Sequence, residues 1–68
     1  MTAISGRDFT RALERNGWVL LRVHGSHHIY GKPGSIVRLS VPVHAGRTLK
    51  AGLLGHLLKQ AGLTEDAL

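Results

Sequence analysis

The fold is decided by residues 18–41, which read WVLLRVHGSHHIYGKPGSIVRLSV. Three segments in this stretch have the branched and aromatic composition of β-strands: residues 18–23, 27–31 and 36–41. The breaker His24-Gly25-Ser26 separates the first two segments. The second turn, Lys32-Pro33-Gly34-Ser35, has Pro and Gly at the two central positions of a type II turn. Two short turns between three strands predict an antiparallel meander, whose last strand should stop pairing at Pro42.

Helical signals lie on both sides of this stretch. Ser5 and Asp8 have the spacing of a capping box, and the helix that they open should end at Gly17. A leucine-rich segment with helical spacing predicts a second helix that ends at Gly62. The sequence therefore predicts one α+β domain over residues 1–68. Its order is α-β-β-β-α, with a three-stranded antiparallel sheet and both helices on one face.

Composition narrows the classes of function. Nine Lys and Arg against four acidic residues give a net charge of +5, which favours a polyanionic or acidic protein partner, although solubility alone can explain a modest charge. The absence of cysteine excludes disulfides and thiolate metal sites. The first residues lack the apolar core of a signal peptide, and no apolar run could span a membrane. We therefore expect a cytoplasmic protein without membrane contact.

Three of the five histidines, His24, His27 and His28, surround Gly25. Imidazoles can bind a transition metal, but consecutive residues of a strand point to opposite faces, so His27 and His28 cannot easily share one ion and no metal is expected. The histidines can also be surface residues without a role, which is the interpretation we prefer for His24. The third interpretation is acid–base chemistry, because imidazole titrates near neutral pH.

RNA is a substrate on which a single histidine is sufficient. Its 2′-hydroxyl is an internal nucleophile, so a protein has only to align it with the phosphate, move a proton and stabilise charge. Any catalysis on this chain is therefore expected to be centred on histidine, and no cofactor is expected. The expected RNA- and phosphate-binding residues are Gly25, Ser26, Arg22, Lys32, Arg38, Arg47 and Lys50. A secondary basic row at helical spacing is Arg7, Arg11 and Arg15, for which a solvated face is the alternative.

The chain resembles the HicA-type toxins, which are small mRNA interferases of bacterial and archaeal toxin–antitoxin pairs. The segments that carry the resemblance are Asn16-Gly17-Trp18 and residues 22–30, 41–44, 49–52 and 57–63. The resemblance implies a fold like the double-stranded-RNA-binding domain and a metal-independent endoribonuclease that binds and cleaves mRNA. It places the catalytic histidine directly after Gly-Ser, at His27, with His28 in reserve. It also implies a HicB-type antitoxin partner that covers the active face.

Strand alternation bears on the choice between the two histidines. His28 shares a face with Tyr30, and a large aromatic side chain suits the buried side, so His27 should lie on the outer face. Ile29 opposes this argument, because it shares the face of His27 and is apolar. The main alternative function is a non-catalytic RNA-binding module that contacts RNA by shape and 2′-hydroxyls. A domain that binds only an acidic protein is a third possibility.

Overall fold

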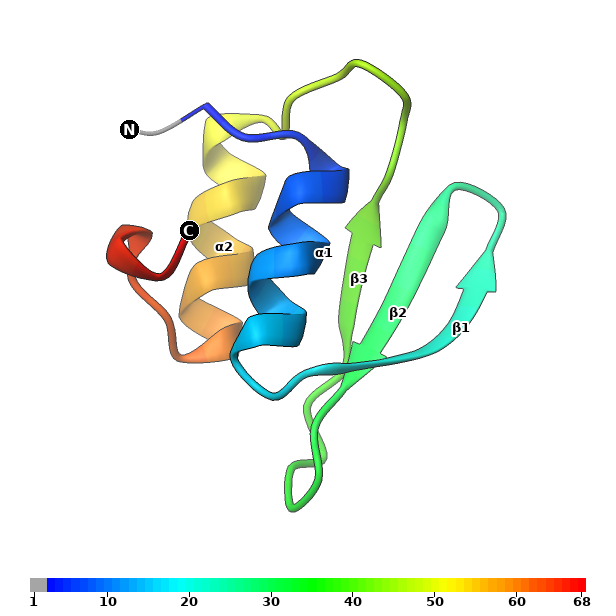
Figure 1. Cartoon of the computed structure of the whole chain (residues 1–68), viewed down its shortest axis with the longest axis vertical. Coiled ribbons are helices and arrows are strands. Elements are labelled where there is room, and N and C mark those ends of the chain that lie inside the picture. The colour runs from blue at the N-terminus through cyan, green and yellow to red at the C-terminus, as the bar shows by residue number, and fades with distance from the viewer. Residues whose placement is uncertain (1–2) are drawn as a thin grey trace.

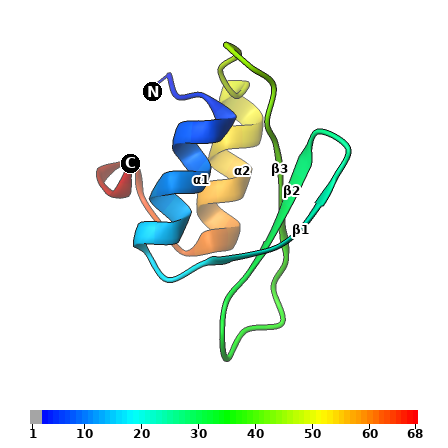
Figure 2. The ribbon, with the colours of Figure 1, turned by 45° about the vertical axis from the view of Figure 1, so that its right-hand side comes forward.

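The computed structural model describes residues 3–68, so the predicted domain's first two residues, Met1 and Thr2, lie outside the described part. The elements in chain order are α1 (Gly6–Arg15), β1 (Val19–His24), β2 (His27–Gly31), β3 (Leu39–Pro42), α2 (Ala51–Ala61) and a 3-10 helix, η1 (Glu65–Ala67). The strands form one antiparallel sheet in the order β1-β2-β3. Both helices lie on the same side of this sheet (Figures 1 and 2). The predicted α-β-β-β-α order is confirmed.

Local sequence explains where α1 begins and ends. The side chain of Ser5 accepts a hydrogen bond from the Asp8 amide at 3.0 Å, as the capping-box spacing predicted. At the other end Gly17 has a φ of 90°. The amides of Gly17 and Trp18 donate to the carbonyls of Glu14 and Leu13, which is the Schellman motif. Trp18 therefore belongs to the helix end rather than to the predicted first strand.

The hydrophobic core lies between the helices and the inner face of β2 and β3. The largest fully buried side chains are Tyr30, Phe9, Leu13, Leu39, Leu54, Leu57 and Val41. In contrast, all six residues of β1 are exposed, because β1 is the edge strand away from the helices (Figure 2). The core thus fixes β2 in place, and β2 carries the two adjacent histidines.

A bulge in β1 sets which of its side chains share a face with β2. Leu20 lies opposite Tyr30 and Arg22 lies opposite Ile29, so Leu21 is the extra residue. The bulge brings Arg22 to the outer face, which is the face of Ile29. The alternation of side chains along a strand, as read from the sequence, does not predict this bulge.

The third strand is shorter than predicted, because β3 begins at Leu39 rather than at Ile36, whose side chain is 96% exposed. The type II turn before it is present, with Gly34 at a φ of 81°. Local hydrogen bonds then replace strand pairing, as the Ser35 hydroxyl accepts from the Val37 amide at 3.1 Å. The predicted strand start is wrong because side-chain hydrogen bonds of this kind compete with the sheet ladder.

Tyr30 joins the sheet to α1 through its hydroxyl, which donates to Glu14 Oε2 at 2.7 Å. Burial, followed by the hydrogen bond to Glu14, raises the pKa of Tyr30 above its ordinary value of 10.0. Because the pKa of Tyr30 is higher in the folded state, the unfolded chain loses the phenol proton at a lower pH than the folded protein does. The contribution of Tyr30 to the free energy of unfolding is therefore complete below pH 10 and falls as the pH rises further.

We expect Tyr30→Phe to lower the free energy of unfolding by about 1 kcal/mol at neutral pH, because one hydrogen bond to a carboxylate is lost. The free energy of unfolding of the variant should also fall less steeply above pH 10 than that of the wild type. Urea unfolding at pH 7 and above pH 10 measures both effects. An equal loss of stability at both pH values would contradict the assignment.

Candidate functional site

The turn between β1 and β2 is a two-residue hairpin loop made of Gly25 and Ser26. Its flanking residues His24 and His27 are paired, and Gly25 has a φ of 62°. A positive φ confined to the first loop residue is the pattern of a type II′ turn, for which glycine is preferred. The Ser26 carbonyl accepts a hydrogen bond from the Val43 amide at 2.7 Å. The hairpin turn is therefore fastened to the loop that follows β3.

His27 and His28 lie on opposite faces of β2. The His27 side chain is exposed on the outer face, and its Nδ1 lies 3.1 Å from the Ser40 hydroxyl oxygen on β3. This contact orients the imidazole and leaves Nε2 without a partner among residues 3–68. His28 is half-buried on the helix side of the sheet, on the face of Tyr30.

A hollow of about 440 Å³ on the outer face lies beside His27; it is called the outer hollow below. Its lining residues are Leu21, Arg22, Ile29, Arg38 and Ser40. The Ser40 side chain lines the hollow and contacts His27. The guanidinium groups of Arg22 and Arg38 give the hollow positive charge. Arg38 is partly engaged, because its Nη1 donates to the carbonyls of Ser35 and Val37 at 3.2 and 3.1 Å. Arg38 Nη1 also lies 3.2 Å from the position of a Cβ atom on Gly31, at the far end of β2, so Arg22, opposite Ile29, is the arginine of the hollow that lies nearer to His27. An oriented imidazole with an arginine on the same face of the sheet is suited to binding a phosphate.

Lys32, a predicted RNA contact, is not near the hairpin turn. It follows the far end of β2, roughly 17 Å from His27 at about 3.4 Å per residue. Its ammonium lies 5.8 Å from the centre of the Trp18 ring. In the structure Lys32 therefore makes a cation–π contact at the end of the sheet opposite to the hairpin turn.

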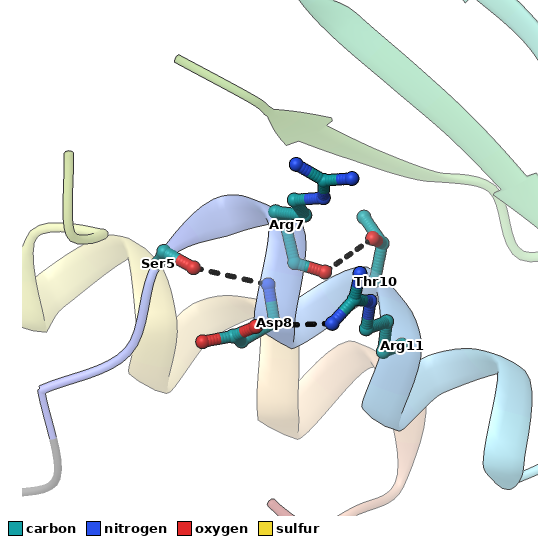
Figure 3. Close-up of polar contacts among 5 residues, drawn as sticks. All are labelled: Ser5, Arg7, Asp8, Thr10 and Arg11. Carbon is teal, nitrogen blue, oxygen red and sulfur yellow. Dashed lines mark hydrogen bonds and ion pairs between the residues drawn. The ribbon is translucent and has the colours of Figure 1, made fainter. Parts of the chain in front are cut away.

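A second group of basic residues lies around the starts of α1 and α2 and the loop that follows β3. The starts of both helices and this loop are at the upper end of Figure 1. A groove of about 500 Å³ on the helix side of the sheet, called the helix-side groove below, is lined by Ser5, Arg7, Thr10, His28, Val43, His44, Ala45 and Gly46. Figure 3 shows Arg7 extending from α1 toward β3. His44 also lines a hollow of about 240 Å³ with Arg47 and Lys50, at the start of α2.

The family model of the HicA toxins of bacterial toxin–antitoxin systems matches residues 6–63 of the chain. The chain belongs to the HicA toxin family. No curated protein was found to match it. The family match spans both helices and all three strands, and with them the whole hairpin turn.

The predicted basic row on α1 is divided in this HicA-family fold. Arg7 lines the helix-side groove, whereas Arg11 and Arg15 line a separate hollow of about 450 Å³ beside the C-terminal segment, together with Asp8 and Glu65. Arg11 also lies 4.0 Å from Asp8 (Figure 3), although both side chains are well exposed and the pair contributes little. Only Arg7 is thus placed near a histidine.

The sequence patterns singled out neither Ser40, which contacts His27, nor His44, which lines the helix-side groove. His44 is the harder of the two to predict. It stands in an irregular loop, where neither strand alternation nor helical spacing assigns a direction to a side chain. Its place follows from the docking of the loop against α1, which joins residues far apart in sequence. The signal available was the Pro-x-His motif of residues 42–44.

Two further observations concern metals and membranes. Within residues 3–68, no three His, Asp or Glu side chains come close enough together to hold a metal ion. The helices in the same part of the chain are all too short or too polar to cross a membrane.

Proposed function

We propose that this HicA toxin is a metal-independent endoribonuclease that binds and cleaves mRNA, with His27 as its general acid or base. The observation that carries the proposal is the contact between His27 Nδ1 and the Ser40 hydroxyl, with Arg22 on the same face of the sheet. An exposed imidazole held in one orientation can exchange a proton at Nε2 with a bound substrate. The net charge of +5 supports a polyanionic substrate.

The cleavage step follows from the chemistry of RNA. The 2′-hydroxyl loses its proton and its oxygen attacks the adjacent phosphorus, while the bond from phosphorus to the 5′-oxygen breaks and that oxygen gains a proton. His27 accepts the first proton or donates the second, and solvent water handles the other proton. Arg22 stabilises the charge on the phosphoryl oxygens, and the Gly25-Ser26 turn allows the backbone to approach the phosphate. The products are a 2′,3′-cyclic phosphate and a 5′-hydroxyl.

His28 is the reserve candidate for the same role. Its half-buried position in the helix-side groove, near Arg7 and His44, favours it as a second imidazole within reach of RNA. It has no hydrogen bond comparable to that of His27 within the described residues. We therefore assign the proton transfer to His27.

The partner proposed for this toxin is an acidic antitoxin of the HicB type. Membership in a toxin–antitoxin family implies a partner protein, and the basic surface offers electrostatic complementarity to an acidic one. An antitoxin that covers the outer hollow would block His27 directly.

The test of the proposed function is cleavage of a defined RNA by the purified protein in the presence of chelator. We expect the unmodified RNA to be cut and to yield 2′,3′-cyclic phosphate ends. The same RNA with a single 2′-deoxy substitution at the cleavage position should resist cutting at that position, because the nucleophile is missing. An intact unmodified RNA, or equal cleavage of the two substrates, would refute the proposal.

A further inference from the structure

The helix-side groove lies on the face of β2 opposite to His27. Its walls are the first turn of α1 and the loop that follows β3, and His28 projects into it from β2. Within residues 3–68 its lining contains no carboxylate, because Asp8 and Glu65 line the separate hollow near the C-terminal segment and Glu14 binds Tyr30. The groove therefore carries only neutral and basic groups.

Several hydrogen-bond donors in this groove are not used within the fold. Among the described residues, no partner is found for the Arg7 guanidinium or for the imidazoles of His28 and His44. The Ser5 oxygen accepts from the Asp8 amide, so its own proton remains available. Thr10 is already engaged, since its hydroxyl donates to the Arg7 carbonyl at 2.7 Å. The available donors are thus a guanidinium, a hydroxyl and two imidazoles around one volume.

This set of donors fits an anion with several oxygens. An arginine fork with histidine and serine donors is suited to a phosphate, and about 500 Å³ is the volume of a small-molecule site. The groove and His27 lie on opposite faces of β2, at the end next to the hairpin turn, so a nucleic acid strand that passes around Gly25-Ser26 would present phosphates to both faces. We propose that the helix-side groove binds a second phosphate of the RNA strand, on the other side of the hairpin turn from the one at His27.

The inference rests on the proposed function for the identity of the strand, but it can be tested without cleavage. A fluorescent single-stranded RNA with 2′-O-methyl groups lacks the nucleophile, so its affinity can be measured by anisotropy at several salt concentrations. We expect Arg7→Gln to weaken binding about tenfold and to lower the salt slope by about 0.7, the value for one phosphate contact on a single strand. The matched control is Arg11→Gln, which removes the same charge from α1 and should change the affinity less than about twofold.

The histidines supply a second matched pair. His44→Gln should weaken binding several-fold, whereas His56→Gln, at an exposed position of α2, should leave it unchanged. Equal effects of Arg7→Gln and Arg11→Gln, or no measurable binding, would overturn the inference. It would also be overturned if His28→Ala abolished cleavage of unmodified RNA without loss of affinity, since the groove would then be the reaction centre.

The two proposals can fail separately. If the wild type binds the 2′-O-methyl RNA through Arg7 but leaves unmodified RNA intact, the endoribonuclease proposal fails and the second phosphate site stands. If unmodified RNA is cut while Arg7→Gln behaves like Arg11→Gln, the phosphate site fails and the endoribonuclease proposal stands.

Discussion

Replacing His27 with alanine should lower the rate of RNA cleavage by about 10²–10⁴-fold, the usual contribution of a general acid or base. The reason is local, because the imidazole that moves the proton is lost while the arginines of the outer hollow remain. His27 is exposed, so the free energy of unfolding should change by less than about 0.5 kcal/mol. Single-turnover cleavage of a defined RNA, together with thermal unfolding of the same preparation, measures both effects.

Two further alanine variants make this result specific. His28→Ala should cut RNA at a rate closer to that of the wild type, and His56→Ala should be indistinguishable from it. Equal rates for His27→Ala and the wild type would remove His27 from the mechanism. A much larger loss in His28→Ala than in His27→Ala would move the proton transfer to the helix side of the sheet.

The fold was predictable from the sequence because its signals are local. Ser5 caps α1 through a residue three positions away, and Gly17 ends the same helix through contacts with its last turn. The turn at Gly34 is likewise set by its own four residues. Prediction was wrong where local hydrogen bonds competed with the sheet, as at the start of β3. It gave no signal for the bulge at Leu21, which depends on how two strands pair.

The candidate site was predictable only in its central part. Strand alternation separates His27 from His28 without any knowledge of tertiary structure. The basic residues carry no comparable signal, because a long exposed side chain has no preferred direction in the sequence. Arg7 therefore lies apart from the other arginines of its row. Lys32 is different, because its place at the far end of β2 from His27 follows from the predicted strand itself, and this distance already argued against its expected RNA contact.

The position of the helix-side groove depends on a glycine that the sequence patterns do not explain. Gly6 is buried at the start of α1, and a Cβ atom there would meet the Pro42 carbonyl and the Val43 Cα atom. These are backbone atoms, so they cannot give way by a change of rotamer. This close approach brings α1 against the end of β3, and the groove lies between α1 and the loop that follows.

Gly6→Ala is accordingly expected to lower the free energy of unfolding by about 2–3 kcal/mol, the cost of forcing extra volume into a packed region. For a domain of this size the melting temperature should fall by roughly 10–20 °C. The matched control is Gly52→Ala in the first turn of α2, where an added Cβ meets no atom within 4 Å. That variant should be neutral or gain up to about 1 kcal/mol, because alanine reduces the entropy of the unfolded chain. Thermal unfolding of both variants tests the close approach, and similar melting temperatures would show that α1 does not depend on it.

If the approach is needed, Gly6→Ala should also displace Arg7 from His28 and weaken RNA binding. The affinity is to be measured at a temperature where the variant is still folded, so that the loss of binding is separated from the loss of stability.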